Sequence, residues 1–351
     1  MKILVINPGS TSTKIAVFED REELYRKNIE HDSAYLAQFK SNQDQLEFRT
    51  EVVQEELKAE GYDLGSFSAV CSRGGPFKPV ESGTYQIDED VLKDASDPAV
   101  GGRHPSALGV QIAAAIGGKY SLPAYFSDPV STDELIPEAR FTGYAGMQRD
   151  SMFHALNQKS ACRKAAEELG KSYEELNLIG VHMGGGVSVA AHRKGRVIDN
   201  FNVINDGSFS MDRGGSLPTF GVIDLCFSGM TKEEVSRTLK GKSGVFSYLG
   251  TKDFKSVEDN AFAGDEQSKA VFDAMIYQHV KDIGAMAAVM DFDVDAVVLT
   301  GGIANSRRVC QAIESRVSSL APVIVIPGEN EMQSLADNAY RVLSGEPAKK
   351  Y

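Results

Sequence analysis

The pattern of apolar and polar positions repeats once along the chain, at a separation of roughly half its length. The first copy begins at residue 2, with its polar turn at residues 19–22, and the second covers residues 178–200. Each copy predicts a strand, a turn of small residues, a second strand, a polar turn and a third strand. Because short apolar runs joined by tight turns are typical of antiparallel hairpins, each copy predicts a three-stranded meander. Two copies of one unit predict two similar domains.

The remaining segments show helical spacing or few helix breakers. Apolar or small residues recur at three- and four-residue intervals over 154–169 and 331–343, and 265–290 predicts one long helix. Ser172-x-x-Glu175 and Thr231-x-x-Glu234 are capping boxes, each of which predicts the start of a helix. Two apolar runs predict buried strands at residues 296–300 and 322–326. The alternation of strands and helices predicts an α/β fold.

The length of 351 residues favours two domains, because a domain averages about 150 residues. No linker rich in Pro, Gly or Ser separates the halves, so the boundary is expected to be a short hinge. We expect an N-terminal domain of residues 1–150 plus 329–351, which contains the returning C-terminal helix. We expect residues 151–328 to form the second domain.

Composition narrows the classes of partner. The chain has 37 Lys+Arg against 49 Asp+Glu, a net charge of −12, which argues against nucleic acid or an anionic membrane as a partner. No apolar run approaches the ~20 residues of a membrane-spanning helix, and the apolar run at 3–6 is too short for a signal peptide. The four cysteines lie far apart, which is typical of reduced thiols in a cytoplasmic protein.

Three glycine-rich turns are candidate phosphate-binding loops, because glycine lets backbone N–H groups approach phosphate oxygens closely. Any tight turn also requires glycine, so one such turn is weak evidence, whereas three together favour a nucleotide ligand. The first turn contributes Asn7, Ser10, Ser12 and Lys14; the second contributes Gly184, Gly185 and Gly186; the third contributes Gly301 and Gly302.

These turns and their neighbours resemble a known family. The segments Val5-Ile-Asn-Pro-Gly-Ser10, Ser72-Arg-Gly-Gly75, Val181-His-Met-Gly-Gly-Gly186 and Leu299-Thr-Gly-Gly-Ile-Ala-Asn-Ser306 are similar to those of the acetate/butyrate kinase family, within the sugar kinase/Hsp70/actin superfamily. The similarity runs essentially end to end, and residues 101–106 and 153–157 look more like the butyrate kinase branch. The resemblance implies two duplicated ribonuclease H-like domains around a nucleotide cleft, which close over the substrates, and a homodimer or higher homo-oligomer.

The activity implied by the resemblance is reversible, in-line phosphoryl transfer from ATP to a short-chain fatty acid, with Mg²⁺, giving an acyl phosphate and ADP. A fatty-acid carboxylate, with a pKa of about 4.3, is already ionised at pH 7 and needs no general base. The site must instead offset the repulsion between two anions, about 4 kcal/mol for unit charges 4 Å apart at an effective dielectric near 20. Butyrate is the expected acceptor.

Other functions stay open on the sequence alone. The acceptor could be acetate, propionate or a branched-chain acid. A kinase of the same fold acting on a sugar hydroxyl would need a general base, for which Asp128 is the only good candidate. A non-enzymatic, actin-like nucleotide switch is a third alternative, although no additional peptide-binding or polymerisation segment is visible.

The expected catalytic residues are Arg73, Arg213, His154 and Asp128. Each arginine is followed by two glycines, which would let it reach a ligand past small neighbours, although a solvated surface arginine is the ordinary alternative. The resemblance implies that both arginines contact the carboxylate and the γ-phosphate. It also implies that His154 contacts the transferring phosphoryl group and that Asp128 orients the phosphoryl group or a metal-bound water.

The remaining expected site residues bind phosphate, nucleotide or metal. By resemblance His182, Asp253, Gly301, Gly302 and Asn305 contact the nucleotide or its phosphates, and Glu331 with Asn7 holds Mg²⁺. Glu329 is the near alternative to Glu331, and His104 is a less certain candidate. Two positions depart from the family pattern: Lys255 stands where an arginine is usual, and the residue before Asn305 is Ala304 where acetate kinases have glutamate. Lysine cannot make the planar two-point contact of arginine.

Overall fold

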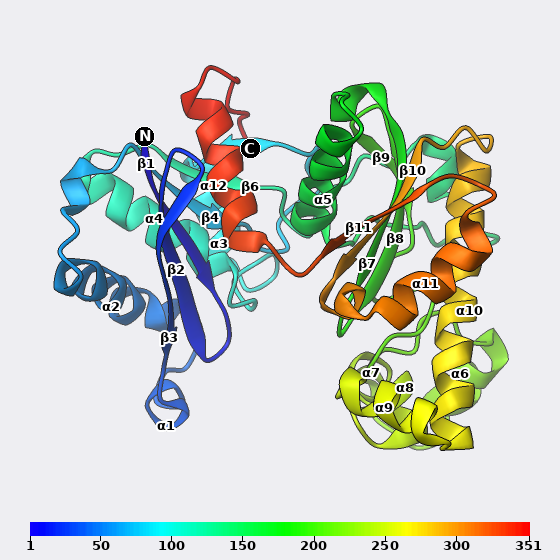
Figure 1. Cartoon of the computed structure of the whole chain (residues 1–351). Coiled ribbons are helices and arrows are strands. Elements are labelled where there is room, and N and C mark those ends of the chain that lie inside the picture. The colour runs from blue at the N-terminus through cyan, green and yellow to red at the C-terminus, as the bar shows by residue number, and fades with distance from the viewer. The chain divides into compact units, whose positions relative to one another are not determined.

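The computed structural model describes the whole chain, Met1 to Tyr351 (Figure 1). The chain forms two compact units: unit 1 comprises Met1–Asp133 with Asn330–Tyr351, and unit 2 comprises Glu134–Glu329. The chain therefore passes from unit 1 to unit 2 after Asp133, earlier than the expected boundary at 150/151. One reason is that the segment after Asp133 already bonds to the sheet of unit 2, because Ile136 N–H donates to the carbonyl of Ile198 at 3.0 Å.

Unit 1 is built on a six-stranded sheet in the order β3-β2-β1-β4-β6-β5. β1 to β3 form the predicted antiparallel meander, and β4 and β6 continue the sheet in parallel. The strands are β1 (Lys2–Pro8), β2 (Ser12–Glu19), β3 (Glu22–Glu30), β4 (Ala69–Arg73), β5 (Thr84–Gln86) and β6 (Ala124–Ser127). The helices are α1 (Ser33–Leu36), α2 (Leu46–Ala59), α3 (Glu89–Ser96), α4 (Ala107–Tyr120) and α12 (Glu331–Leu343), with 3-10 turns η1 (Gln43–Gln45) and η2 (Leu64–Ser66).

Alternation along β1 places its side chains on both faces of that sheet. Leu4 and Ile6 pack in one apolar cluster with residues of α2 and α4, such as Ile112. Ile3 and Val5 are equally buried, and α12 contacts β1 and β4. The C-terminal helix therefore covers a sheet whose first strand lies more than 300 residues earlier, and its first residue, Glu331, comes close to the end of β1.

Unit 2 repeats this arrangement with a five-stranded sheet in the order β11-β10-β7-β8-β9. Its strands are β7 (Asn177–Met183), β8 (Val187–Arg193), β9 (Arg196–Asn200), β10 (Ala296–Gly301) and β11 (Val323–Pro327). Its helices are α5 (Ala155–Glu168), α6 (Thr219–Cys226), α7 (Lys232–Gly241), α8 (Val245–Leu249), α9 (Phe254–Ala263), α10 (Glu266–Val289) and α11 (Arg307–Val317), with 3-10 turns η3 (Pro137–Arg140), η4 (Tyr173–Glu175) and η5 (Gly302–Asn305).

The second sheet also buries both faces. Ile179 and Val181 of β7 pack in a cluster with residues of α10 and α11. Leu178, which alternates with them, packs in a separate cluster with residues of α5 such as Ala161. In both units a meander is followed by two parallel strands, so β3-β2-β1-β4-β6 corresponds to β9-β8-β7-β10-β11. The prediction of a duplicated α/β fold is confirmed.

One predicted helix is wrong. The Ser172–Glu175 capping box forms, with Ser172 N–H donating to the Glu175 carboxylate at 2.9 Å, but only the 3-10 turn η4 follows it. β7 begins at Asn177, because the apolar run that follows enters the sheet. The Thr231–Glu234 box does open a helix, α7. None of the helices has the length and apolar character that crossing a lipid bilayer would require.

Candidate active site

The first glycine turn joins β1 to β2 and displays exposed donors. Gly9 N–H donates to the Ser12 carbonyl at 2.8 Å, whereas the N–H groups of Ser10 and Thr11 donate to no protein acceptor. Lys14 is exposed and lies opposite Asn7 in the β1–β2 register, so both side chains project from the same face of the sheet. The turn therefore has unused N–H groups and a nearby cation, as an anion site requires.

A buried arginine that the sequence analysis missed lies beneath this turn. Arg49 of α2 is fully buried, and its guanidinium donates to the carbonyls of Gly9 (2.9 Å), Ser10 (2.8 Å) and Ser12 (3.0 Å). It also donates to Thr13 Oγ1 at 3.2 Å. Desolvation lowers the pKa of Arg49 to about 10. Arg49 binds the carbonyl groups of the turn, so the backbone N–H groups of the turn remain available to a ligand.

Three predicted residues of unit 1 meet at the ends of β1, β4 and α12. Arg73 Nη1 lies 2.7 Å from Glu331 Oε1, and Asn7 Nδ2 donates to Glu331 Oε2 at 2.7 Å. The Arg73 and Glu331 side chains are 26% and 19% exposed, so this ion pair remains accessible to solvent. The guanidinium of Arg73 is thus already placed against a carboxylate.

The glycines after Arg73 serve close packing more than access. A Cβ on Gly74 would lie 2.8 Å from the Pro129 side chain, and one on Gly75 would lie 3.0 Å from the ring of Phe77. Phe77 belongs to the apolar core of unit 1. Close packing against Pro129 and Phe77 therefore requires glycine at both positions, in addition to any room that the glycines leave for the arginine.

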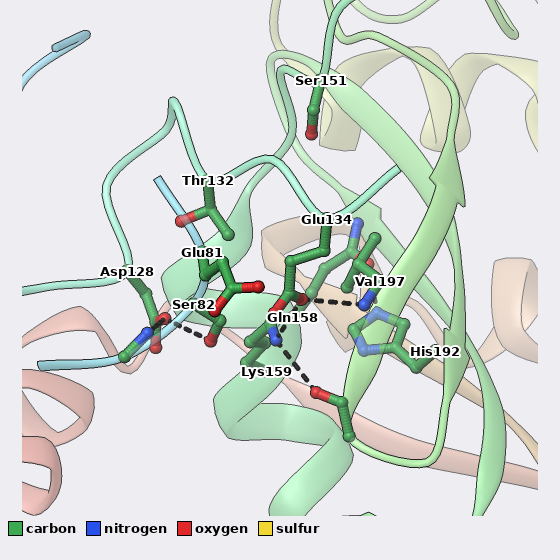
Figure 2. Close-up of polar contacts among 12 residues, drawn as sticks. Glu81, Ser82, Asp128, Thr132, Glu134, Ser151, Gln158, Lys159, His192 and Val197 are labelled. Atoms are coloured by element: carbon green, nitrogen blue, oxygen red, sulfur yellow. Dashed lines mark hydrogen bonds and ion pairs between the residues drawn. The ribbon is translucent and has the colours of Figure 1, made fainter. Parts of the chain in front are cut away.

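Asp128 follows β6 and is buried at 2% exposure. Its Oδ1 accepts hydrogen bonds from the Ser82 hydroxyl (2.6 Å) and the Gly83 N–H (2.9 Å), and Oδ2 accepts from Asn338 Nδ2 at 3.2 Å. Figure 2 shows the Ser82–Asp128 bond. Both carboxylate oxygens are engaged by donors of unit 1. The geometry gives Asp128 a positioning role in this segment.

His104, the less certain candidate, lies close enough to Arg73 to be affected by its charge. Its Nδ1 is 2.6 Å from Ser106 Oγ. Desolvation and the charge of Arg73 lower the pKa of His104. Its ring is therefore neutral near pH 7 and can serve as a hydrogen-bonding group close to Arg73.

The second glycine turn, between β7 and β8, is shaped around Arg213. Gly184 N–H donates to the Gly186 carbonyl at 3.0 Å. A Cβ on Gly186 would clash with Nη1 of Arg213, so only glycine leaves room for the guanidinium. Burial lowers the pKa of Arg213, which nevertheless stays cationic. The structure thus brings two predicted elements of unit 2 into direct contact.

Arg213 is carried by the long loop 201–218, which α10 and the glycine turn hold in place. Ser210 Oγ donates to the Gly185 carbonyl at 2.6 Å, and Ser208 N–H donates to Asp282 Oδ2 of α10 at 2.7 Å. Burial raises the pKa of Asp282 to about 6. Ordering a loop without regular structure costs conformational entropy. These hydrogen bonds offset that cost and keep Arg213 at the turn.

Two predicted histidines stack beside the same turn. The rings of His154 and His182 have centroids 3.7 Å apart and planes 11° from parallel. His182 Nδ1 is 2.6 Å from Asn157 Oδ1, which also accepts from Thr300 Oγ1 at 3.2 Å. His182 Nε2 is 3.6 Å from the exposed Glu329 carboxylate. Glu329 therefore lies in unit 2 beside His182, whereas Glu331 lies in unit 1 beside Arg73.

The start of α5, which carries these histidine contacts, is fixed by a buried ion pair. Lys159 and Glu134 are 1% and 4% exposed, and their charged atoms are 2.8 Å apart. Glu134 Oε2 accepts from Val197 N–H at 2.9 Å, and Lys159 Nζ donates to the Gly195 carbonyl at 3.1 Å (Figure 2). Because breaking a buried pair leaves an uncompensated charge, this contact ties α5 firmly to the β8–β9 hairpin.

The third glycine turn combines a closely packed glycine, Gly301, with an exposed one, Gly302. Gly301 has φ of +87° and approaches Met183 so closely that a Cβ would clash with its backbone, whereas nothing lies within 4 Å of a Cβ on Gly302. Asn305 Nδ2 donates to the Gly302 carbonyl at 2.9 Å. Asp253 is exposed and caps α9, accepting from Lys255 N–H at 3.1 Å. Here Asp253 and Asn305 act locally as a helix cap and a turn cap.

Glu331 and Asn7 are the candidate ligands of Mg²⁺. No group of three or more His, Cys, Asp or Glu side chains is arranged to hold a metal ion. Magnesium bound with a nucleotide takes most of its ligands from phosphates and water and needs only one or two carboxylates. Glu331, partly exposed and beside Asn7, fits that smaller demand.

Comparison with known proteins gives consistent matches. The acetokinase family model matches residues 141–340. The curated butyrate kinase 1 of Clostridium acetobutylicum is 45% identical over 353 residues, covering 100% of this chain and 99% of that protein. The crystal structure of Porphyromonas gingivalis acetate kinase is 19% identical with a TM-score of 0.78, covering 97% of this chain and 99% of that one. Entamoeba histolytica acetate kinase is 17% identical with a TM-score of 0.80, covering 98% and 100%. At these identities the two structures establish the shared fold.

Proposed function

Because the chain belongs to the acetokinase family, we propose that it transfers the γ-phosphoryl group of ATP to a short-chain fatty acid, with butyrate as the preferred acceptor. The chain is a kinase with a carboxyl group as acceptor, and its substrates are ATP and a small organic acid. The observation that carries the butyrate proposal is the 45% identity with butyrate kinase 1 over the full chain. Acyl phosphates are energy-rich, so the reaction is reversible.

We propose that unit 1 binds the acceptor carboxylate through Arg73. Its contact with Glu331 supports this role, since it shows a carboxylate held 2.7 Å from the guanidinium. Glu331 with Asn7 would hold Mg²⁺, which neutralises phosphate charge when bound. The exposed Ser10, the half-buried Ser12 and Lys14 would bind phosphate oxygens. No residue has to remove a proton, because the acid arrives ionised at pH 7.

We propose that unit 2 binds the nucleotide and stabilises the transferring phosphoryl group. Arg213 supplies a cation and His154 supplies a ring N–H donor, which offset negative charge in the transition state, and the ring of His182 stacks on that of His154. The N–H groups of Gly184, Gly185 and Gly186 would face phosphate oxygens. Gly301, Gly302, Asn305 and Asp253 would contact the nucleoside. The contact between Arg213 and Gly186 supports a shared task for the arginine and the turn.

The geometry of Asp128 argues against a sugar kinase. A hydroxyl acceptor needs a base with an accessible lone pair, whereas Asp128 is 2% exposed and its oxygens accept three hydrogen bonds. Preference among acids would come from burial of methylenes. Two additional CH₂ groups are worth about 1.6 kcal/mol, or about fifteen-fold in favour of butyrate over acetate.

Trapping acyl phosphate with hydroxylamine tests the function. The protein is supplied with ATP, Mg²⁺ and one of acetate, propionate, butyrate, isobutyrate or valerate, and hydroxamate is measured. We expect hydroxamate with butyrate at the highest kcat/KM. A higher kcat/KM with another acid would overturn the butyrate preference alone. Formation of a sugar phosphate without any hydroxamate would overturn the acyl-kinase proposal itself.

We also propose that the chain forms a homodimer through α6. The sequence of α6 is largely apolar, yet none of its residues is buried. Phe220 of α6 is 81% exposed, and Phe227, the residue that follows the helix, is 86% exposed. Large clustered apolar surface is unusual on a monomer and marks an interface. Phe220→Glu is expected to give a monomer in sedimentation equilibrium. Phe292→Glu, which alters an equally large exposed side chain away from α6, is expected to leave a dimer. A wild-type monomer would exclude the proposal.

A cytoplasmic location completes the proposal. All four cysteines are free thiols. Free thiols persist in reducing compartments, where ATP is also available. Loss of activity on oxidation of the isolated protein, restored by a thiol reductant, would support this assignment, whereas an intrachain disulfide in protein isolated from cells would contradict it.

A further inference from the structure

Behind His154 a chain of buried polar side chains crosses unit 2. Tyr173 OH is 2.7 Å from His192 Nδ1, and His192 Nε2 is 3.0 Å from Gln158 Oε1. Gln158 Nε2 is 2.8 Å from Ser188 Oγ, which is 2.8 Å from His154 Nδ1. Gln158 and His192 have no exposed surface and Ser188 is 1% exposed. Figure 2 shows Gln158 of α5 beside His192 of β8. Buried networks of this kind persist only when every donor meets an acceptor.

The backbone settles the direction of these bonds at Gln158. Its Nε2 lies 2.9 Å from the Ser188 carbonyl, which can only accept, so the amide nitrogen must face Ser188. The other amide atom, Oε1, therefore faces His192 and accepts a proton from Nε2–H of that ring. Burial and the charges of Lys159 and Arg163 keep the pKa of His192 well below its ordinary value, so Nδ1 is unprotonated and accepts from Tyr173.

The direction continues through Ser188 to His154. Ser188 Oγ accepts from Gln158 Nε2 at 2.8 Å and from the backbone N–H of His154 at 3.3 Å. A hydroxyl oxygen has two acceptor positions, so both are used. Its single O–H then donates to His154 Nδ1, 2.8 Å away. A ring nitrogen that accepts a hydrogen bond carries no proton, which places the proton of His154 on Nε2.

The sequence makes room for this network at Gly180. A Cβ at that position of β7 would lie 2.5 Å from Gln158 Oε1 and 2.7 Å from His192 Nε2. Glycine in the middle of a buried strand weakens the strand and often marks a close approach. Gly180 is thus explained by the Gln158–His192 hydrogen bond, an observation independent of the bonds to Ser188.

We propose that Ser188 and Gln158 are positioning residues that hold His154 as the neutral tautomer protonated on Nε2, so that this nitrogen donates a hydrogen bond to the transferring phosphoryl group. This inference rests on the proposed role of His154. The opposite tautomer would turn a lone pair toward phosphoryl oxygens and repel them. A second benefit concerns the stacked ring of His182, because two imidazolium rings 3.7 Å apart would repel one another.

Nitrogen NMR of protein labelled at histidine with ¹⁵N tests the tautomer directly. The wild-type protein is expected to show an unprotonated Nδ1 and a protonated Nε2 for His154, whose signals are identified by their loss in His154→Gln. In Ser188→Ala the donor to Nδ1 is absent, and a mixture of both tautomers is expected. Ser188→Thr retains the hydroxyl and is expected to restore the wild-type pattern. A wild-type proton on Nδ1, or an unchanged pattern in Ser188→Ala, would overturn the proposal.

Kinetics supply a second readout with a matched control. Ser188→Ala is expected to lower kcat about tenfold, the effect of one lost hydrogen bond, with the KM for ATP and for the acid within about twofold of wild type. Ser188→Thr is expected to recover most of kcat. Ser268→Ala, which removes another buried hydroxyl of unit 2 outside the network, should match wild type in both readouts. Equal kcat for Ser188→Ala and wild type would contradict the proposal.

A second variant covers the case in which Ser188→Ala does not fold. Gln158→Met keeps the side-chain length but removes the donor to Ser188, so the hydroxyl can either donate to or accept from His154 Nδ1. A mixture of tautomers is again expected, and an unmixed Nε2–H tautomer would refute a role for Gln158. The two proposals fail separately: a His154 proton on Nε2 in a protein that forms no hydroxamate refutes only the function, whereas hydroxamate formation with the proton on Nδ1 refutes only the inference.

Discussion

Single residues in this protein are often dictated by a specific neighbour. Gly186 is the sharpest case, because any side chain there would occupy the position of the Arg213 guanidinium. Both residues are predictable from the sequence for separate reasons, Gly186 from a glycine turn and Arg213 from the glycines that follow it. Contact between them could not be predicted, since it depends on the path of loop 201–218 back to the turn.

Gly186→Ala is expected to lower kcat about 100-fold, because a shift of about 1 Å in a positioning group can cost that much. Steady-state kinetics with saturating ATP and acid measure it. Gly284→Ala is the control: that glycine lies on an exposed part of α10, with nothing within 4 Å of a Cβ. The control should keep its activity and gain about 0.5–1 kcal/mol in unfolding free energy. Normal kcat in Gly186→Ala would remove Arg213 from the catalytic set.

Arg73→Lys is expected to raise the KM for the acid about tenfold while the KM for ATP changes little. Lysine keeps the charge but loses the planar, two-point contact with a carboxylate. The two KM values are measured separately in the hydroxamate assay. An unchanged KM for the acid would show that Arg73 serves only its ion pair with Glu331.

At the scale of elements, the first glycine turn is held in place by a buried arginine of α2. Arg49, Val53 and Leu57 follow one another at four-residue spacing on α2, and all three are fully buried. An arginine in line with apolar residues of a helix indicated that the arginine is buried. A buried guanidinium needs hydrogen-bond acceptors. Its partners, three carbonyls of a turn about 40 residues earlier, could be found only in the folded chain.

Arg49→Met is expected to lower the unfolding free energy by about 3–5 kcal/mol, because three part-buried carbonyl groups lose their donor. Arg49→Lys should fall between wild type and Arg49→Met, since one ammonium group cannot reach all the carbonyls. Urea unfolding gives the stabilities, and the KM for ATP reports on the turn. Equal stability of wild type and Arg49→Met would show that water replaces the guanidinium.

The start of α5 teaches a similar lesson. His154, Asn157 and Gln158 lie three and four residues apart, which places three polar side chains on one face of a helix that is otherwise largely buried. Of these three residues, only His154 was predicted as a site residue from the sequence. The polar stripe indicated further polar partners inside unit 2, but the partners themselves, Ser188 and His192, come from β8, and only sheet packing brings them to this face.

The whole molecule is expected to lose stability in mild acid. Burial lowers the pKa of His31 and of His279 to about 4, and that of His192 further below its ordinary value; Arg49 adds to the shift at His31. The unfolded chain takes up these protons near pH 6.5, so the contribution of each histidine is present above that pH and is lost as pH falls toward 4. Asp282, with its pKa raised to about 6, takes up a proton in the folded state and offsets one histidine below pH 6.

The net effect is a free energy of unfolding about 4 kcal/mol lower at pH 5 than at pH 7, summed over the transitions of both units. Urea unfolding at both pH values measures it. In His279→Leu the difference should shrink by about 2 kcal/mol, because that ring is fully buried with neither nitrogen hydrogen-bonded. A pH-independent free energy would contradict the buried, neutral state of these histidines.

Local sequence was sufficient for the duplicated meanders, the glycine turns and α12, because strand alternation, turn residues and helical spacing act over a few neighbouring residues. It also indicated most of the candidate site. Tertiary structure alone decided that Glu331 meets Arg73 and Asn7, that Arg49 supports the first turn and that Ser188 reaches His154. Hydrogen bonds form between groups that packing brings within about 3 Å, and the packing of sheets and helices joins residues whose separation in sequence carries no information about that distance.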